Sequence, residues 1–381
     1  PYLGEEPLVA LDLCAAPGGK STLLLDLLPA GSTLVSNEYV RSRAHILTEN
    51  LQKWGSPYSI VTSTDAASLG RMRSSYDLIL VDAPCSGEGM MRKDEEARRQ
   101  WSPQLVSQCA ALQRSILEDI WPALAPGGLL VYSTCTLNGQ EDEAQVAYLV
   151  EELGAEPLGL QALEPFVAPS ALSPYPCYRM MPHRTRGEGL FLALLRKPIT
   201  EGTSKSSAAR KAKAAKVGRS ASVKPPKELL PWLKPSPALQ WRTLEETRLL
   251  ALPEPTARLL EELEALRIPV LSAGLQVAEL KGRDWLPQPA LALSPLLALE
   301  AFPRVELTRE ESLRYLAGEA LTLPPETPRG FVLVSYSGAP LGFAKHLGNR
   351  TNNLYPQPWR IRQLDAVLRR LEESQPEEDV Q

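Results

Sequence analysis

The sequence has 381 residues, of which 44% are hydrophobic and 23% are charged, and its formal net charge is −4. This length supports one large core and a second, smaller unit, while the net charge lacks the basic balance that usually marks nucleic-acid-binding proteins. No apolar run approaches the roughly 18 residues of a membrane-spanning helix and no signal peptide opens the sequence, so we expect a cytoplasmic protein with no membrane partner.

Short apolar runs alternate with longer amphipathic runs through residues 1–199, which is typical of a parallel sheet covered by helices. The apolar runs predict strands at residues 8–13, 33–36, 58–61, 77–81, 129–133 and 189–195. Helical periodicity lies at residues 21–28, 40–54, 103–124 and 138–153. We therefore predict an α/β, doubly wound domain whose ligands bind beyond the carboxyl ends of its strands.

The composition changes at residue 200, where Ser, Ala, Lys, Arg and Pro replace the apolar period. Residues 200–228 predict a basic, flexible linker, which serves either as a solvated spacer or as a segment that contacts RNA phosphates. Beyond it we expect an intermediate domain at 229–302, a smaller α+β or β-rich domain at 303–371 and an acidic tail at 372–381. Within the β-rich domain, residues 330–345 predict a hairpin around a Ser-Gly-Ala-Pro turn.

A glycine loop follows the first expected strand. Residues 14–20 read Cys-Ala-Ala-Pro-Gly-Gly-Lys and precede an expected helix, where a tight glycine turn lets backbone N–H groups approach a ligand. The ending Gly19-Lys20-Ser21 is similar to that of a triphosphate-binding loop, but that motif requires a glycine where Cys14 stands. The spaced-glycine fingerprint of dinucleotide sites is also absent, so the sequence disfavours both of these cofactor classes.

Acidic residues follow three successive strands beyond this loop. Glu38, Asp65 and Asp82 stand after the second, third and fourth expected strands. A carboxylate after the second strand commonly accepts hydrogen bonds from a ribose diol, although a lone acid in such a place is often only a helix cap. Three of them beside a glycine loop favour a ligand that carries adenosine.

Two cysteines follow the ends of neighbouring strands. Cys85 lies in Asp-Ala-Pro-Cys-Ser-Gly and Cys135 lies in Ser-Thr-Cys. Cytosine C5 is a poor nucleophile toward a methyl sulfonium, but addition of a thiolate at C6 turns the ring into an enamine and activates C5. The reaction also needs a proton source near N3 and a base that removes the C5 proton. Asp82, Cys85 and Cys135 could divide these tasks.

The other cysteines are Cys14, Cys109 and Cys177, to which the sequence assigns no catalytic role. Five cysteines are an odd number, and they are widely spaced with no C-x-x-C pair. This pattern favours neither a disulfide framework nor a metal site, so we expect no metal.

Four motifs resemble those of the Nol/Nop/Sun RNA cytosine-C5 methyltransferases: residues 12–22, 37–43, 82–87 and 133–135. The resemblance implies a Rossmann-like methyltransferase domain with S-adenosylmethionine as cofactor. It also implies that Cys135 is the nucleophile and that Cys85 assists product release, and we expect Asp82 to orient and protonate the cytosine. The cofactor-binding residues implied by motif position are Cys14, Ala15, Ala16, Pro17, Gly18, Gly19, Lys20, Glu38, Asp65 and Asp82, with Arg43 in support.

Residues 182–191 and the C-terminal segments 341–346 and 352–356 are similar to the bacterial branch of this family, which methylates 16S ribosomal RNA and carries a C-terminal PUA-like RNA-binding domain. Members of the family carry a region ahead of the first motif. Because the sequence starts at Pro1 rather than Met, just before that motif, we expect it to be N-terminally truncated.

The resulting hypothesis is S-adenosylmethionine-dependent methylation of cytosine C5 in 16S ribosomal RNA, through a cysteine adduct at C6, by a monomer whose partner is RNA or the small ribosomal subunit. The alternatives are a transfer-RNA cytosine methyltransferase and a non-catalytic RNA-binding or ribosome-assembly factor. Aromatic side chains interleave with basic ones near the C-terminus, as in surfaces on which bases stack. The candidates are Trp232, Trp241, Trp285, Tyr336, Phe343, Tyr355 and Trp359, beside Lys345, His346, Arg350, Arg360 and Arg362.

Overall fold

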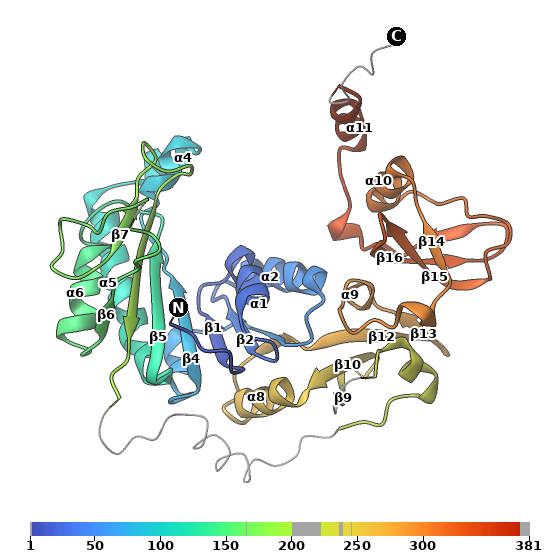
Figure 1. The fold of residues 1–381 in the computed structure, drawn as a ribbon, viewed down its shortest axis with the longest axis horizontal. Helices are drawn as coiled ribbons and strands as arrows, with labels where there is room; N and C mark the ends of the chain where they lie inside the picture. Colours follow the sequence, from blue (N-terminus) through green and yellow to red (C-terminus); the bar gives the residue numbers. More distant parts are fainter. Residues whose placement is uncertain (1, 165, 200–221, 236–238, 245, 374–381) are drawn as a thin grey trace. The chain divides into compact units, whose positions relative to one another are not determined.

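The computed structural model describes residues 2–164, 166–199, 222–235, 239–244 and 246–373. Most of the expected linker and of the acidic tail lies outside these residues. The chain forms two compact units (Figure 1). Unit 1 comprises residues 1–51, 58–220 and 255–273, and unit 2 comprises residues 52–57, 221–254 and 274–381.

Unit 1 is built on a nine-stranded sheet with the order β11-β3-β2-β1-β4-β5-β8-β6, and β7 pairs with β8. Its parallel strands are β1 (Val9–Asp12), β2 (Thr33–Asn37), β3 (Ser59–Thr62), β4 (Tyr76–Asp82) and β5 (Leu124–Thr134). The antiparallel strands are β6 (Glu156–Leu158), β7 (Tyr178–Met180), β8 (Leu190–Arg196) and β11 (Val270–Ala273). The strand order reverses between β1 and β4, which makes their carboxyl ends the expected ligand position in a doubly wound fold.

The helices of unit 1 lie on both sides of this sheet (Figure 1). They are α1 (Gly19–Leu27), α2 (Arg41–Trp54), α3 (Ala66–Gly70), α4 (Glu95–Gln100), α5 (Pro103–Ile120), α6 (Glu143–Glu151) and α8 (Glu254–Ala265). The predicted α/β, Rossmann-like class is therefore confirmed. Two helix bounds differ from the expectation by more than two residues. Helix α5 ends at Ile120, and the following 3-10 turn at Trp121–Ala123 contains Pro122. Helix α6 begins only at Glu143 because residues 138–142 form a turn.

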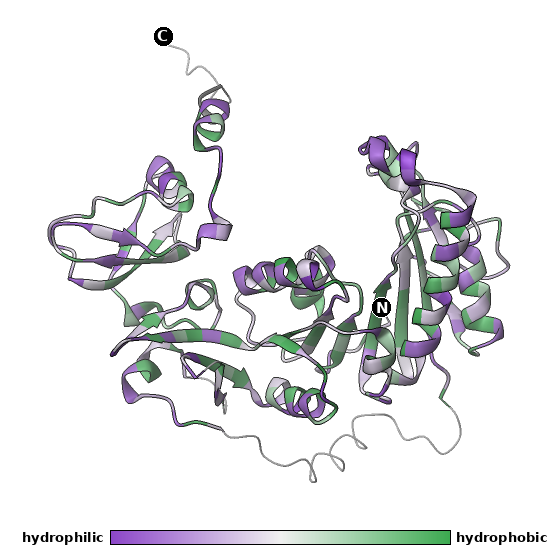
Figure 2. Cartoon of the chain, turned by 180° about the vertical axis from the view of Figure 1, so that it is seen from behind, coloured by the Kyte–Doolittle hydropathy of each residue, from purple (hydrophilic) through white to green (hydrophobic). Residues whose placement is uncertain are grey.

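The strands of unit 1 are largely hydrophobic, as their green colour in Figure 2 shows. Their buried apolar side chains form the core of this unit. One cluster joins Leu8 and Ala10 of the β1 segment to Leu34, Leu78 and Leu129 on neighbouring strands. All five are at most 9% exposed. This burial fixes the register of the parallel strands and thereby places their carboxyl ends side by side.

A segment distant in sequence completes unit 1. Strand β11 pairs antiparallel with β3, and α8 precedes it. We expected residues 229–302 to form one intermediate domain, whereas the structure divides this range between the two units. The hydrophobic pattern of the sequence did not indicate this division. Strand β11 has only four residues, which is too short for a periodic signal that would separate it from its neighbours.

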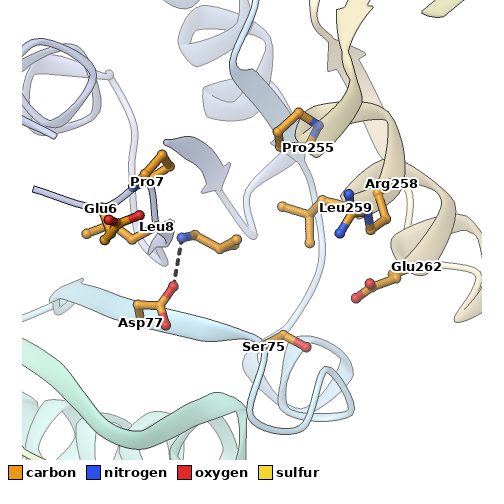
Figure 3. Close-up of a pocket in the computed structure, with 10 residues that line it drawn as sticks. Glu6, Pro7, Leu8, Ser75, Asp77, Pro255, Arg258, Leu259 and Glu262 are labelled. Atoms are coloured by element: carbon orange, nitrogen blue, oxygen red, sulfur yellow. Dashed lines mark hydrogen bonds between the residues drawn. The ribbon is translucent and has the colours of Figure 1, made fainter. Parts of the chain in front are cut away.

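A pocket lies at the amino ends of β1 and β4, the opposite ends from those that the fold predicts to bind ligand (Figure 3). Residues from the start of both strands and from α8 line it, and the Asp77 carboxylate there accepts a hydrogen bond of 2.9 Å from Val9 N. Asp77 therefore ties the amino ends of the two central strands together.

Unit 2 contains two four-stranded sheets. The first comprises β9 (Leu239–Leu244), β10 (Arg248–Pro253), β12 (Leu275–Lys281) and β13 (Asp284–Pro287). The second comprises β14 (Arg304–Glu306), β15 (Gly330–Tyr336), β16 (Ala339–His346) and β17 (Thr351–Asn353). Its helices are α9 (Pro289–Ala292), α10 (Arg309–Ala317) and α11 (Leu364–Glu373). The predicted hairpin is confirmed: Tyr336 pairs with Ala339, and Ser337 and Gly338 both take positive φ in the turn.

Several residues expected on an RNA-facing surface are buried in unit 2. Trp241 and Phe343 are 7% and 2% exposed and belong to one apolar cluster, in which Phe343 lies 4.8 Å from Phe302 between ring centroids. His346 is 5% exposed and its Nδ1 lies 3.2 Å from the Thr351 hydroxyl. These three side chains stabilise the core and cannot act as stacking platforms, because alternation along a strand puts every second side chain inside.

Among the described residues, no helix is both long enough and apolar enough to cross a membrane.

Candidate active site

The residues singled out in the sequence gather at the carboxyl ends of β1, β2, β4 and β5. Asp82 ends β4 and Thr134 ends β5, and the register pairs Asp82 with Ser133. Cys85 lies three residues after the end of β4, and Cys135 lies one residue after the end of β5. The parallel pairing of β4 and β5 therefore brings the two cysteine-bearing loops together, although 50 residues separate the cysteines.

The glycine loop connects β1 to α1. Gly18 has φ of 116°, a conformation that side-chain-bearing residues rarely adopt, and a Cβ there would lie 3.2 Å from Leu47 Cδ1. Helix α1 then starts at Gly19, where an added Cβ would meet no atom within 4 Å. Open space therefore adjoins the first turn of α1, whose backbone N–H groups form a positive helix terminus.

A buried hydrogen bond fixes the base of this loop. The Ser21 hydroxyl donates to the Asp12 carboxylate at 2.7 Å, and both residues are fully buried. Burial raises the pKa of Asp12 to about 7, because a charged carboxylate loses its hydration there. Burial also raises the pKa of the neighbouring Cys14 thiol to about 12, so Cys14 remains protonated at neutral pH and is a poor nucleophile.

Glu38 follows β2 and is 4% exposed. Its Oε1 accepts a hydrogen bond of 2.9 Å from Val40 N, and its Oε2 lies 3.4 Å from Arg43 Nη1. The other terminal nitrogen of Arg43 donates to Ala16 O at 2.9 Å. Arg43 thus links the Glu38 carboxylate to the glycine loop. The sequence analysis gave Arg43 only a supporting role.

Asp65 has a structural explanation of its own. Its carboxylate accepts a hydrogen bond of 2.7 Å from Ser68 N and caps the start of α3. This bond to a backbone N–H lowers the pKa of Asp65. The side chain is exposed, so a second contact with a ligand stays a prediction.

Asp82 connects the glycine loop to β5. Its Oδ2 lies 2.7 Å from Lys20 Nζ, and its Oδ1 accepts a hydrogen bond of 2.7 Å from the Ser133 hydroxyl. Both carboxylate oxygens therefore have a donor from a different element, which fixes the orientation of the carboxylate beside the cysteines.

The sulfur atoms of Cys85 and Cys135 lie 3.2 Å apart. The hydrogen bond from Cys85 lowers the pKa of the Cys135 thiol to about 7, and the same bond raises the pKa of Cys85. The two shifts have opposite signs because the thiol proton of Cys85 stabilises the Cys135 thiolate. The same hydrogen bond makes that proton harder to remove from Cys85. The arrangement provides one reactive thiolate and one protonated neighbour near neutral pH.

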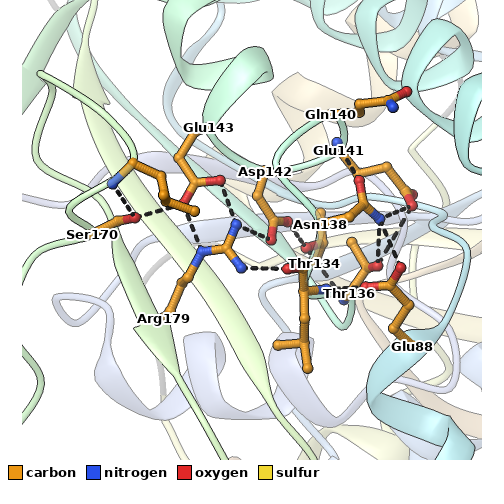
Figure 4. Close-up of polar contacts among 12 residues, drawn as sticks. Glu88, Thr134, Thr136, Asn138, Gln140, Glu141, Asp142, Glu143, Ser170 and Arg179 are labelled. Carbon is orange, nitrogen blue, oxygen red and sulfur yellow. Dashed lines mark hydrogen bonds and ion pairs between the residues drawn. The ribbon is translucent and has the colours of Figure 1, made fainter.

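A buried polar network next to these cysteines was missed by the sequence analysis. Glu141 is fully buried, and its carboxylate contacts Ser86 in the loop after Cys85 and Thr136 in the loop after Cys135. Figure 4 shows Glu141 beside Thr136 and Asn138 of the second loop. Its neighbours Asp142 and Glu143 contact Thr134 and Arg179 instead. The run Glu-Asp-Glu was the available signal, but we placed it inside a predicted helix, where acids usually face solvent.

Among the described residues, no group of three His, Cys, Asp or Glu side chains is arranged to hold a metal ion.

The site fits S-adenosylmethionine. The open first turn of α1 lies beside a loop without bulky side chains at Gly18 and Gly19. The buried Glu38 carboxylate supplies the acceptor that a ribose diol requires, and Asp82 lies between this loop and the cysteines.

Comparisons with known proteins identify relatives of this chain. Residues 4–196 match the family described as 16S rRNA methyltransferase RsmB/F, and residues 302–361 match the methyltransferase RsmF PUA domain. Ribosomal RNA small subunit methyltransferase F of Serratia proteamaculans is 34% identical over 379 residues, which cover 93% of this chain and 73% of that protein. The protein of the same name from Salmonella paratyphi B is 34% identical over 364 residues, with the same two shares covered.

Solved structures match this chain over a shorter range. NSun6 from Pyrococcus horikoshii, crystallised with SFG, is 28% identical with a TM-score of 0.46, and the match covers 51% of this chain and 49% of that one. A methyltransferase homolog from the same organism is 26% identical with a TM-score of 0.44, and the match covers 50% and 62%. This chain therefore spans less than two thirds of these solved proteins.

Fold and motifs together define an S-adenosylmethionine-dependent methyltransferase of the Nol/Nop/Sun type, as the resemblance implied. The chain belongs to the 16S rRNA methyltransferase RsmB/F family, with a C-terminal PUA domain.

Proposed function

We propose that this chain methylates C5 of a cytosine in 16S ribosomal RNA, with Cys135 as the nucleophile that attacks C6. The single observation that carries the proposal is the pair of thiols 3.2 Å apart beside Asp82. The printed names of the relatives and the matched PUA domain support ribosomal RNA as the substrate.

Cys135 starts the reaction. Because its pKa is about 7, roughly half of its thiol is ionised at pH 7. The thiolate forms a bond from Sγ to C6, the C5–C6 double bond opens, and the electron pair moves through the ring toward N3. S-adenosylmethionine, when bound, supplies an electrophilic methyl group to the activated C5. Residues 14–20, Glu38 and Asp65 would hold this cofactor.

Asp82 orients the cytosine in this proposal. Its carboxylate lies beside the cysteines and can accept a hydrogen bond from the exocyclic amino group. The carboxylate can also relay a proton as charge develops at N3: it takes the proton from the ammonium of Lys20, 2.7 Å away, and passes it to N3, which leaves Asp82 a carboxylate and Lys20 neutral.

Cys85 serves the release of the product. Its pKa is raised first of all by the hydrogen bond to the Cys135 thiolate. This cause disappears once Cys135 is bonded to C6 and has lost its charge, so Cys85 ionises more readily at that stage. Its thiolate then removes the C5 proton, the C5–C6 double bond re-forms, and the bond from Cys135 to C6 breaks.

We propose that the chain acts as a monomer in the cytoplasm, where ribosomal RNA is found. On unit 2, Lys345, Arg350 and Arg362 remain the proposed RNA-facing cations. Arg360 is less suited, because its guanidinium lies within 3.4 Å of Tyr355 O and would contact any Cβ added at Gly318.

Nucleotide-resolution mapping of 5-methylcytosine tests the substrate. We expect a new mark in small-subunit ribosomal RNA after incubation with the chain and S-adenosylmethionine, and none with Cys135→Ala. A mark confined to transfer RNA would move the assignment to a transfer-RNA methyltransferase. Absence of any mark with the wild-type chain would favour a non-catalytic RNA-binding factor.

A further inference from the structure

Glu141 is a fully buried carboxylate that no step of the proposed reaction uses. It lies in the turn between Cys135 and α6 (Figure 4). A carboxylate without solvent is costly unless hydrogen-bond donors surround it. Its donors come from both cysteine-bearing loops, which gives this residue a specific connection to the site.

The first set of donors belongs to the loop that carries Cys85. Ser86 N donates to Oε2 at 2.9 Å, and the Ser86 hydroxyl donates to Oε1. Gln113 of α5 donates to Oε2 at 2.9 Å and to Pro84 O at 3.0 Å. The residues on both sides of Cys85 are therefore tied to the same carboxylate, directly or through Gln113.

The second set belongs to the loop that carries Cys135. Asn138 Nδ2 donates to Oε1 at 2.7 Å, and the Thr136 hydroxyl lies 3.5 Å from the same oxygen. Ser86 Oγ lies 3.1 Å from Thr136 Oγ1, so the residues that directly follow the two cysteines also contact each other. The backbone oxygen of Glu141 accepts a bond of 2.7 Å from Tyr132 of β5.

We propose that Glu141 is a positioning residue that sets the distance between the two sulfur atoms and thereby keeps Cys135 reactive near neutral pH. The inference rests on the proposed function of the cysteine pair. The hydrogen bond between the thiols depends on their separation, and the carboxylate holds the residue after each cysteine. Loss of this link would let the two loops move apart and weaken the bond that stabilises the Cys135 thiolate.

The chemistry of the contacts requires a carboxylate. The Glu141 carboxylate offers an acceptor at both oxygens, and every group aimed at these oxygens can act as a donor. In Glu141→Gln, one of the oxygens becomes an NH₂ group. Asn138 Nδ2 and Ser86 N cannot become acceptors, so whichever way the amide is turned, two donors face each other at one position.

Glu143 provides the matched control. It lies two residues away on α6 and is 6% exposed, and its carboxylate binds Arg179 and Ser170. No hydrogen bond described for it reaches residues 84–86. A general weakening of this buried region would affect both variants, whereas a role in positioning the thiols would affect Glu141→Gln alone.

The test is the rate at which iodoacetamide alkylates Cys135, located by mass spectrometry and measured as a function of pH. We expect Glu141→Gln to lower this rate about fivefold at pH 7, as a rise of the pKa by one unit would, and to leave it unchanged well above both pKa values. Glu143→Gln should match the wild type. Turnover should fall through kcat, with KM for RNA unchanged, and should recover at higher pH.

Unchanged alkylation in Glu141→Gln, or an equal fall in Glu143→Gln, would overturn the proposal. Should Glu141→Gln not fold, Ser86→Ala decides the question, because it removes the hydroxyl contacts to Glu141 and Thr136 and leaves the carboxylate. We expect it to lower alkylation at pH 7 at least twofold, and no change would count against the proposal. Alkylation needs neither RNA nor cofactor, so a failure of the methylation assay in the wild type stays distinct from a failure of this inference.

Discussion

Lys20 Nζ and Asp82 Oδ2 lie 2.7 Å apart and join the glycine loop after β1 to the end of β4. The other oxygen of Asp82 accepts the Ser133 hydroxyl, two residues before Cys135. One carboxylate therefore contacts the segment proposed to hold the cofactor and the segment that carries the proposed nucleophile.

Asp82→Asn should lower the rate of methyl transfer about 10²–10⁴-fold, the usual range for removal of a group that orients a substrate and moves its proton. Single-turnover kinetics with RNA and saturating S-adenosylmethionine measures this. Asp77→Asn is the matched control, because Asp77 lies on the same strand and contacts Val9 N at its other end. Equal losses in the two variants would indicate damage to β4 rather than to the reaction.

The rate should fall at low pH, because the nucleophile is the Cys135 thiolate. Its pKa is lowered to about 7 by the hydrogen bond from Cys85, so the thiolate is the major form above that pH and is lost as pH decreases below it. We expect single-turnover rates to reach a plateau above about pH 8 and to decrease about tenfold per unit well below pH 7. A rate independent of pH between about 5 and 8 would contradict this assignment.

The two adjacent glycines of the cofactor loop should respond differently to alanine. Gly18→Ala forces a side chain into φ of 116° and against Leu47, so we expect a loss of about 1–3 kcal/mol in the free energy of unfolding. Gly19→Ala meets no protein atom and should leave that stability nearly unchanged. It should nevertheless weaken S-adenosylmethionine binding, measured by calorimetry, because its Cβ enters the space proposed for the cofactor. Unchanged affinity in Gly19→Ala would argue against that placement.

Replacing Arg350 and Arg362 together by alanine should weaken RNA binding. Both side chains are exposed on unit 2. If each contacts a phosphate, the slope of log affinity against log salt should become shallower by about one for each arginine removed. Binding titrations at several salt concentrations measure the slope. An unchanged slope would remove this surface from the proposal.

The sequence predicted the parallel core of unit 1 well, because buried strands and amphipathic helices have different periods. Its register also follows from composition: Leu34, Leu78 and Leu129 must all face one core. The residues of the cysteine motifs could likewise be predicted to meet, since both follow ends of strands that adjoin in such a fold.

The contribution of β11 and the function of Glu141 could not be predicted in this way. β11 joins the sheet through contacts of a segment some 200 residues distant from β3. Glu141 looks like an ordinary surface acid until the loops around it are placed, because its burial depends on Ser86 and Gln113, which come from other parts of the chain. Similarly, Phe343 was expected to face RNA, and only the packing against Phe302 shows that it belongs to the core.

The central claim is that Cys135 forms the bond to C6 and that Cys85 is needed to break it. Its most direct test is denaturing electrophoresis of Cys85→Ala, Cys135→Ala and Cys109→Ala after incubation with labelled small-subunit RNA and S-adenosylmethionine. We expect a covalent protein–RNA band with Cys85→Ala, none with Cys135→Ala, and turnover without a trapped band with Cys109→Ala. A trapped band with Cys135→Ala but not with Cys85→Ala would contradict this claim and reverse the roles of the two cysteines.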